Sequence, residues 1–233
     1  MRSIWRTSGL ALDRGLARDI ALVCLADGIV GLSYGAISVG GGLQLWVPVV
    51  LSILVFAGAS QFLFVGIVAA GGSPIAATIA GLLVNTRHVA FGLAISEVIG
   101  NGWRRLPGSH LMTDENVAFA LGQEELARKR AAYWACGIGI FVSWNVGVVI
   151  GALAGSVITD TDVFGLDAAF PAVLLALVLP AVRDRSTRTA ALVGAGAALV
   201  ATPFLPAGLP VLFALVGLLF YRPAAKPSPE LVG

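Results

Sequence analysis

Long apolar runs separated by short polar stretches dominate this chain of 233 residues. A helix that crosses a bilayer needs about 20 mostly apolar residues, and several of the runs reach that length. Each span in hydrocarbon must satisfy its own backbone hydrogen bonds, so we expect helices. The predicted fold is an all-α, polytopic transmembrane bundle with one discontinuous segment. The hydrophobic segments are predicted at 20–39, 43–70, 74–99, 132–158, 164–182, 188–205 and 207–221.

Two places in this pattern are predicted to be irregular. In segment 74–99, the polar run Asn85-Thr86-Arg87-His88 separates two half-length apolar runs. This arrangement favours a discontinuous helix with a polar centre. Three prolines between positions 202 and 210 break the apolar pattern again. The last two segments therefore form either two thin spans or a hairpin that dips in and returns.

The distribution of polar residues predicts the domain organisation. Residues 1–19 form a cytoplasmic N-terminal segment, residues 20–221 form the transmembrane domain, and the Pro-rich tail 222–233 is disordered. A polar loop at 100–131 interrupts the transmembrane domain. Within it, Thr113 is predicted to cap a short helix from Asp114 to Glu125 that lies against the membrane surface.

Composition supports a membrane location. The chain is 58% hydrophobic and 12% charged, with a mean hydropathy of +0.91, whereas a soluble domain has about 25% charged residues. Its outer surface is therefore expected to face lipid. The net charge of +2 is small and dispersed, which argues against nucleic acid. The sequence has no P-loop, metal-spaced histidine pair or nucleophile elbow, so we expect no enzyme, cofactor or metal site.

Charge also sets the expected orientation. The positive-inside rule places residues 104–130 in the cytoplasm. Three full spans before that loop would put the four N-terminal arginines outside. Either the N-terminus disobeys the rule, or one of the first three segments does not cross fully, and our hypothesis names segment 74–99.

Arg87 is the strongest candidate for a functional residue. An arginine near the centre of a span costs about 2.5–3.5 kcal/mol on insertion scales, so it needs a polar cavity or a partner. It serves either substrate binding or gating, or it forms a structural ion pair with Asp27 or Glu97. Both carboxylates and His88 are candidates for ion pairing or coupling. Asp27 is the better proton carrier, because Glu97 lies close to a segment end.

The second segment contains small residues and an uncharged amide at its centre. Gly58 lets another helix or a ligand approach closely. Gln61 binds either a substrate or a neighbouring carbonyl group, and the spacing favours helix packing. Asn85, in the third segment, is a further candidate for substrate contact.

The fourth segment carries a ridge of glycines. Gly147, Gly151 and Gly155 recur every four residues, which is typical of a helix-contact surface within the chain or against a partner. One turn earlier, Trp144 and Asn145 either line a cavity or pack between helices.

Four stretches carry a resemblance to a known family. They are Leu54-Val-Phe-Ala-Gly-Ala-Ser-Gln-Phe62, Leu83-Val-Asn-Thr-Arg-His88, Leu111-Met-Thr-Asp-Glu115 and Gly165-Leu-Asp-Ala-Ala-Phe-Pro171. In order and spacing they resemble the AzlC family, the larger subunits of branched-chain amino acid exporters. The resemblance implies secondary export of small neutral amino acids such as valine, leucine, isoleucine and methionine. It also implies a smaller AzlD-type membrane subunit and a place in the inner (plasma) membrane.

The predicted function is therefore that of an exporter subunit with a binding site at the membrane midplane. The alternatives are a structural or assembly subunit of a membrane complex, and an exporter of a different small solute. An intramembrane enzyme is disfavoured because no nucleophile–base pair is apparent. The candidate residues around the substrate are Gln61, Asn85, Arg87, Trp144 and Asn145.

Overall fold

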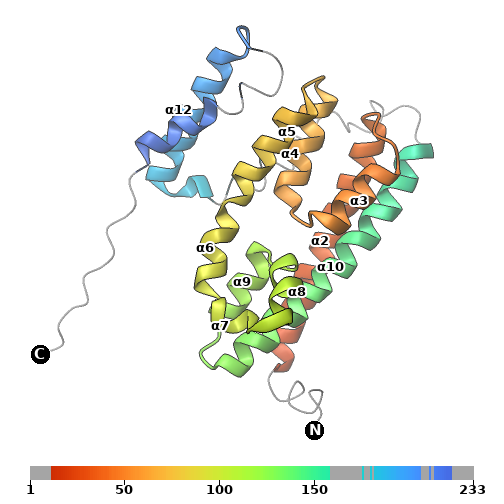
Figure 1. Ribbon diagram of the computed structural model, residues 1–233, viewed down its shortest axis with the longest axis vertical. Coiled ribbons are helices and arrows are strands. Elements are labelled where there is room, and N and C mark those ends of the chain that lie inside the picture. Colours follow the sequence, from red (N-terminus) through yellow and green to blue (C-terminus); the bar gives the residue numbers. More distant parts are fainter. Residues whose placement is uncertain are drawn as a thin grey trace, which may run out of the picture.

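The computed structural model describes residues 12–157, 175, 179, 181–205, 210 and 213–221. Every regular element in these ranges is a helix (Figure 1), which confirms the predicted all-α fold. Three helical stretches in the described ranges are long and apolar enough to cross a membrane. They are α2 (Arg14–Gly40), the stretch Pro74–Ala94 and α10 (Leu126–Val157). The predicted count of seven segments is not confirmed.

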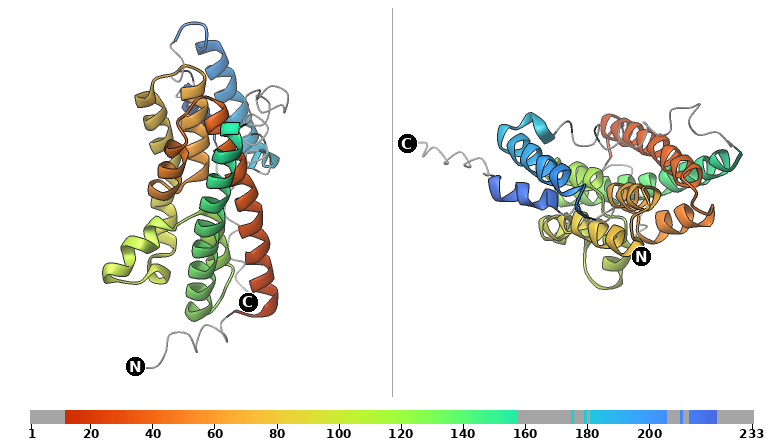
Figure 2. Two further views of the ribbon diagram at one scale, coloured as in Figure 1. Left: turned by 90° about the vertical axis from the view of Figure 1, so that its right-hand side faces the viewer. Right: turned by 90° about the horizontal axis from the view of Figure 1, so that it is seen from above.

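The two longest helices, α2 and α10, lie side by side and run in the same direction (Figures 1 and 2). Glycines of α10 bring the two backbones into contact. A Cβ added at Gly151 would overlap the carbonyl oxygen of Leu32, and one at Gly155 would lie 2.7 Å from that of Ala36. Gly147 faces α2 in the same way. The glycine ridge therefore packs within the chain.

An ion pair joins the starting ends of these two helices. Asp13 caps α2 by accepting a hydrogen bond from the Leu16 backbone N–H at 2.8 Å, and Arg128 Nη2 of α10 lies 2.6 Å from its other oxygen. The Leu16 N–H and the Arg128 guanidinium lower the pKa of Asp13 below its usual value. The Asp13–Arg128 ion pair is therefore present at neutral pH and is lost only as the pH falls through the lowered pKa of Asp13.

Segment 43–70, predicted to be one span, is instead a helical hairpin. It consists of α3 (Trp46–Leu54) and α4 (Gly58–Ala69), which are about 14 and 18 Å long, each about half the hydrocarbon thickness. Both ends of the hairpin lie beside the end of α2. Helix α3 follows α2 after a short turn, and a Cβ at Gly41 would lie 3.6 Å from that of Ala69. The chain runs partway along the bundle and returns to the end at which it started (Figure 1).

The reversal takes place at Phe56, which has the left-handed φ of +43°. This conformation costs a non-glycine residue roughly 1–3 kcal/mol, so its surroundings must hold it. Phe56 is buried, and its ring centroid lies 5.0 Å from that of Phe141 on α10. Gln61 Nε2 of α4 donates to the carbonyl oxygen of Leu51 on α3 at 2.9 Å. Contacts distant in sequence thus stabilise a break that the apolar pattern did not indicate.

A second, shorter hairpin approaches from the opposite end of the bundle (Figure 1). It is formed by α8 (Arg105–His110) and α9 (Asp114–Leu121). At its tip, His110 Nε2 donates to the carbonyl oxygen of Ile53 in the first hairpin at 2.8 Å. From the sequence, the helix that begins at Asp114 was expected to lie against the membrane surface. In the structure, the first turn of this helix, α9, lies where the tips of the two hairpins meet.

The first hairpin resolves the conflict in orientation. By length and composition, α2 and the stretch Pro74–Ala94 can each cross a membrane, whereas α3 and α4 each reach only about half the hydrocarbon thickness. The start of α2 and the polar residues after position 100 therefore lie at the same end of the bundle (Figure 2). Both basic stretches then obey the positive-inside rule. The helix lengths therefore favour 43–70, rather than 74–99, as the segment that does not cross.

Segment 74–99 is interrupted where the sequence predicts, but only slightly. It is divided into α5 (Pro74–Asn85), α6 (Arg87–Ala94) and α7 (Ser96–Ile99). Thr86, between α5 and α6, keeps helical angles (φ −57°, ψ −24°), and its N–H donates to the Leu83 carbonyl oxygen at 3.2 Å. The interruption is a tightened turn rather than an unwound centre.

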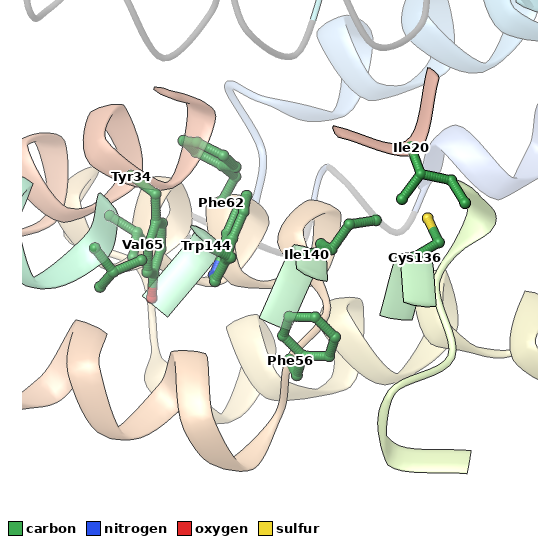
Figure 3. Close-up of a cluster of buried hydrophobic side chains, with 9 residues drawn as sticks. Ile20, Tyr34, Phe56, Phe62, Val65, Cys136, Ile140 and Trp144 are labelled. Atoms are coloured by element: carbon green, nitrogen blue, oxygen red, sulfur yellow. The ribbon is translucent and has the colours of Figure 1, made fainter. Parts of the chain in front are cut away.

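An apolar cluster holds the first hairpin against α2 and α10 (Figure 3). At its centre, the rings of Tyr34 and Trp144 stack with centroids 5.9 Å apart, and Phe62 meets Tyr34 edge-on at 5.3 Å. The buried members are Ile20, Tyr34, Phe56, Phe62, Val65, Cys136, Ile140, Trp144 and Val148.

Beyond α10, α12 (Arg185–Ala201) packs against η4 (Ala214–Phe220), preceded by η3 (Ala181–Arg183). Gly194 faces Ala214, and this packing is compatible both with two thin spans and with a hairpin that dips in and returns. Several predictions lie outside the described residues: the stretch 1–11, most of segment 164–182, the motif at 165–171, and the tail 222–233.

The α2–α10 contact predicts that one added methyl group lowers the stability of the protein at Gly151 but not at Gly196. Gly151→Ala should destabilise the protein by about 1–3 kcal/mol, because the new Cβ overlaps the α2 backbone. The measurement is the free energy of unfolding in mixed micelles. Gly196→Ala is the control, since a Cβ there meets nothing within 4 Å. Equal stability of the two variants would contradict the close backbone contact.

Candidate functional site

A cavity of about 180 Å³ opens where the two hairpin tips meet. Ile140 and Trp144 of α10 line it, and they lie near the middle of a helix about 48 Å long. The cavity is thus expected at mid-depth in the membrane. Its volume corresponds to about six water molecules, which suits a small solute. Its other walls come from α2, α4, α6 and the first turn of α9.

The start of α4 is open toward this cavity. Ala57, Gly58 and Ala59 line the cavity, and no side chain caps the helix. The backbone N–H groups of a first helical turn have no intrahelical acceptor and carry a partial positive charge. An uncapped start at membrane depth is therefore ready to bind an anionic group.

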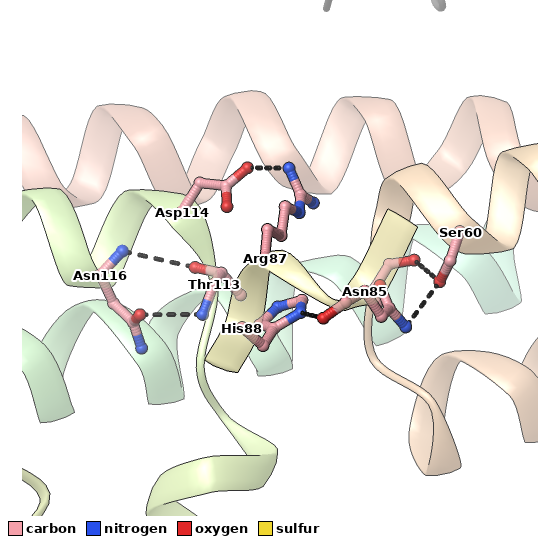
Figure 4. Close-up of polar contacts among 8 residues, drawn as sticks. Ser60, Asn85, Arg87, His88, Thr113, Asp114 and Asn116 are labelled. Carbon is pink, nitrogen blue, oxygen red and sulfur yellow. Dashed lines mark hydrogen bonds and ion pairs between the residues drawn. The ribbon is translucent and has the colours of Figure 1, made fainter. Parts of the chain in front are cut away.

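The start of α9, by contrast, is satisfied internally. Thr113 Oγ1 accepts from the Asn116 N–H at 3.3 Å, and Asn116 Oδ1 accepts from the Thr113 N–H at 2.9 Å (Figure 4). Asn116 also donates to the carbonyl oxygen of Leu111 at 2.7 Å. Asp114 and Glu115 supply negative charge in the first turn. Of the two helix starts at the hairpin tips, only that of α4 is left for a ligand.

Arg87 extends from the start of α6 and forms an ion pair with Asp114 of α9 (Figure 4). Its partner is therefore neither Asp27 nor Glu97, the two carboxylates predicted from the sequence. Glu97 belongs to α7, where its carbonyl oxygen accepts from Arg130 at 2.9 Å. Both side chains of the Arg87–Asp114 pair keep about two fifths of their surface exposed (37% and 42%). The pair thus lies within reach of solvent or substrate in the cavity.

Two further carboxylates line the same cavity, Asp27 from α2 and Glu115 from α9. Asp27 Oδ2 is buried and has no hydrogen-bond partner among the described residues. A buried carboxylate oxygen without a partner is unfavourable, and an ammonium group would satisfy it. The cavity therefore combines an open helix start with unpaired acidic oxygens.

Apolar side chains complete the walls. Trp144 is 5% exposed and its six-membered ring lies against Gly58, where an added Cβ would lie 3.0 Å from Cη2. Phe62 meets Trp144 edge-on with centroids 6.3 Å apart. Val30 and Ile140 extend the apolar surface. This surface suits an aliphatic side chain.

The remaining residues predicted to contact substrate lie elsewhere. Gln61 and Asn85 line a second cavity between α3, α4 and α5. Asn145 accepts from Ser52 Oγ at 2.7 Å and so joins α10 to α3. His88 lines the first cavity, and its Nδ1 donates to the Asn85 carbonyl oxygen at 3.0 Å. The structure thus gathers Arg87, Trp144, Asp27, His88 and Gly58 around the first cavity, and separates Gln61, Asn85, Asn145 and Glu97 from it.

Sequence reasoning did not select three residues that shape the site, namely Phe56, His110 and Asp114. Asp114 lies in the stretch Leu111–Glu115, which carries the family resemblance, and this was the available signal. In the described part of the chain, no group of three His, Cys, Asp or Glu residues could hold a metal ion.

Comparison with known proteins gives the family. The family model described as AzlC protein matches residues 22–158, more than half of the chain. The chain belongs to the AzlC family. Both hairpins and every residue that lines the first cavity lie in the matched range.

Several curated relatives of this AzlC-family chain are known. The branched-chain amino acid transport protein AzlC of Bacillus subtilis is 24% identical over 198 residues, 82% of this chain and 77% of the relative. The inner membrane protein YgaZ of Escherichia coli is 35% identical over 57% of this chain and 54% of its own length. An uncharacterized membrane protein of Helicobacter pylori is 26% identical over 65% of this chain and 67% of its own. No solved structure matches the chain.

The Arg87–Asp114 pair predicts energetic coupling between α6 and α9. Arg87→Ala and Asp114→Asn should each destabilise the protein, and the double variant should be less destabilised than the sum. We expect a coupling of roughly 1–2 kcal/mol, between the values for exposed and buried pairs. The measurement is a double-mutant cycle in the free energy of unfolding. The same cycle on the exposed pair Asp13–Arg128 is the control and should give less. Additive effects at Arg87 and Asp114 would rule out the pair.

Proposed function

We propose that this chain is the larger subunit of a secondary exporter of small neutral amino acids, and that the first cavity binds the substrate. The observation that carries the proposal is the uncapped start of α4, which opens on a cavity at membrane depth. Discontinuous helices of transporters bind substrate carboxylates in this way. The Bacillus subtilis relative is named as a branched-chain amino acid transport protein, which supports the substrate class.

The cavity suits the three parts of an aliphatic amino acid. The N–H groups of Gly58 and Ala59 are suited to the carboxylate. The unpaired oxygen of Asp27, with Glu115 nearby, is suited to the ammonium group. Trp144 and its apolar neighbours would contact the side chain. In this arrangement Arg87 serves as the counter-ion of Asp114 rather than as the carboxylate ligand.

Selection among aliphatic substrates should be modest. One methylene more or less in an apolar pocket changes binding by about 1–3 kcal/mol. Valine, leucine, isoleucine and methionine are therefore expected to compete with one another. We further propose that the chain acts in the inner membrane together with a small AzlD-type subunit, as the family resemblance implies.

The proposal predicts that one methyl group at the start of α4 impairs transport. Gly58→Ala places a Cβ 3.0 Å from the Trp144 ring, in the space proposed for the carboxylate. We expect the apparent affinity for leucine to fall about tenfold or more. The measurement is counterflow of labelled leucine in membrane vesicles, with and without the small subunit.

The matched control is Gly92→Ala on α6. A Cβ there meets only the flexible end of Met112, at 3.7 Å, so transport should be unchanged. If a folded Gly58→Ala variant keeps the wild-type affinity for leucine, the substrate does not bind at the start of α4. Absence of counterflow by the wild-type chain with its subunit would reject the exporter function itself.

A further inference from the structure

A second cavity, of about 150 Å³, lies on the other side of α4. It is enclosed by α3, α4 and α5, and includes Leu51 and Val55 at the end of α3 and Leu82 and Asn85 at the end of α5. The carboxyl-terminal ends of helices carry a partial negative charge. The end of α3 therefore lines this cavity, whereas a helix start lines the first; α5 continues into α6 through Thr86 and has no free end there.

Two acceptor oxygens in this cavity lack partners. Gln61 Oε1 and Asn85 Oδ1 are buried and form no hydrogen bond with any described residue. Gln61 is only 1% exposed. Buried acceptors of this kind are rare and require an explanation.

The hydrogen-bond network fixes which atom of each amide is the free one. Gln61 faces the carbonyl oxygen of Leu51 at 2.9 Å, and only its nitrogen can donate there. Ser60 Oγ donates to the Ala57 carbonyl oxygen at 2.9 Å, so it accepts from the Asn85 nitrogen at 3.2 Å. The oxygens of both amides are thus the atoms left without partners.

The other polar side chains in the lining also present oxygen lone pairs. Thr78 Oγ1 donates to the Pro74 carbonyl oxygen at 2.8 Å and, like Ser60, keeps acceptor capacity. The lining contains no charged residue. Neutral oxygens without a carboxylate are poorly suited to divalent ions. Together with the negatively polarised end of α3, they suit a monovalent cation.

We propose that the second cavity binds a monovalent alkali cation, with sodium as the expected ion, through the oxygens of Gln61 and Asn85. The ion is expected to bind whether or not substrate is present. A role of the ion in driving export rests on the proposed function. Since the two cavities lie on opposite sides of α4, an ion in the second would favour one position of the hairpin that also lines the first.

The test is the thermal unfolding midpoint of the purified full chain in detergent, without amino acid. Sodium, potassium and choline chloride are compared at constant ionic strength. Sodium should raise the midpoint saturably by a few degrees at ten times its dissociation constant, and choline should not. A midpoint that is equal in all three salts overturns the proposal.

Substitutions of residues that line the second cavity test whether the ion binds there. Asn85→Ala should abolish the sodium-dependent shift, with Asn101→Ala in an exposed loop as control. If Asn85→Ala does not fold, Thr78→Val decides, because that hydroxyl bonds only within its own helix. We expect it to weaken the apparent sodium affinity several-fold.

Thr189→Val on α12, where the hydroxyl makes the same type of bond, should have no effect. A full sodium shift in both cavity variants would place the ion elsewhere and overturn the proposal. Because no amino acid is present, failure of this test leaves the leucine counterflow result intact. Failure of counterflow likewise leaves the binding result intact.

Discussion

Broken backbone at membrane depth must have its hydrogen bonds satisfied by protein, and this constraint explains most of the architecture. No water is available in hydrocarbon to replace an intrahelical partner, so irregular backbone is tolerated only when it is buried or lines a cavity. Backbone N–H groups and Gln61 bond the Leu51 carbonyl oxygen near the end of α3, His110 bonds the Ile53 carbonyl oxygen, and Thr113 with Asn116 caps α9. The start of α4 receives no such cap. It is tolerated because it opens on a cavity.

The hairpin of α3 and α4 thereby separates two environments of opposite polarity. On one side, a helix start, unpaired acidic oxygens and apolar walls form a cavity that suits an amino acid. On the other, the end of α3 and neutral oxygens form a cavity that suits a cation. Helix α4 contributes to both, so a small displacement of this one helix would change both sites together. The close α2–α10 contact supplies a rigid wall against which it could move.

The sequence predicted those features that depend on local pattern. The apolar runs indicated α2 and α10, the glycine spacing indicated a contact ridge, and the run around Arg87 indicated the interruption at Thr86. It did not predict the reversal at Phe56, which neither glycine nor proline marks. That turn depends on Phe141 and Gln61, and the partner of Arg87 is 27 residues away on another helix. Such contacts follow from the packing of the hairpins, which periodicity does not encode.

The most direct test of this account is whether the two ends of the hairpin meet. In a chain without Cys24 and Cys136, cysteines at Gly41 and Ala69 should form a disulfide under mild oxidation, because their Cβ atoms would lie 3.6 Å apart. In a continuous helix these positions would be separated by about 42 Å. The measurement is the loss of both free thiols in the monomer, with cysteines at Gly41 and Leu93 as the control pair. Rapid loss in the first pair alone is the predicted result. Persistence of both thiols in a folded protein would show that the two ends of segment 43–70 do not meet, and would contradict the account.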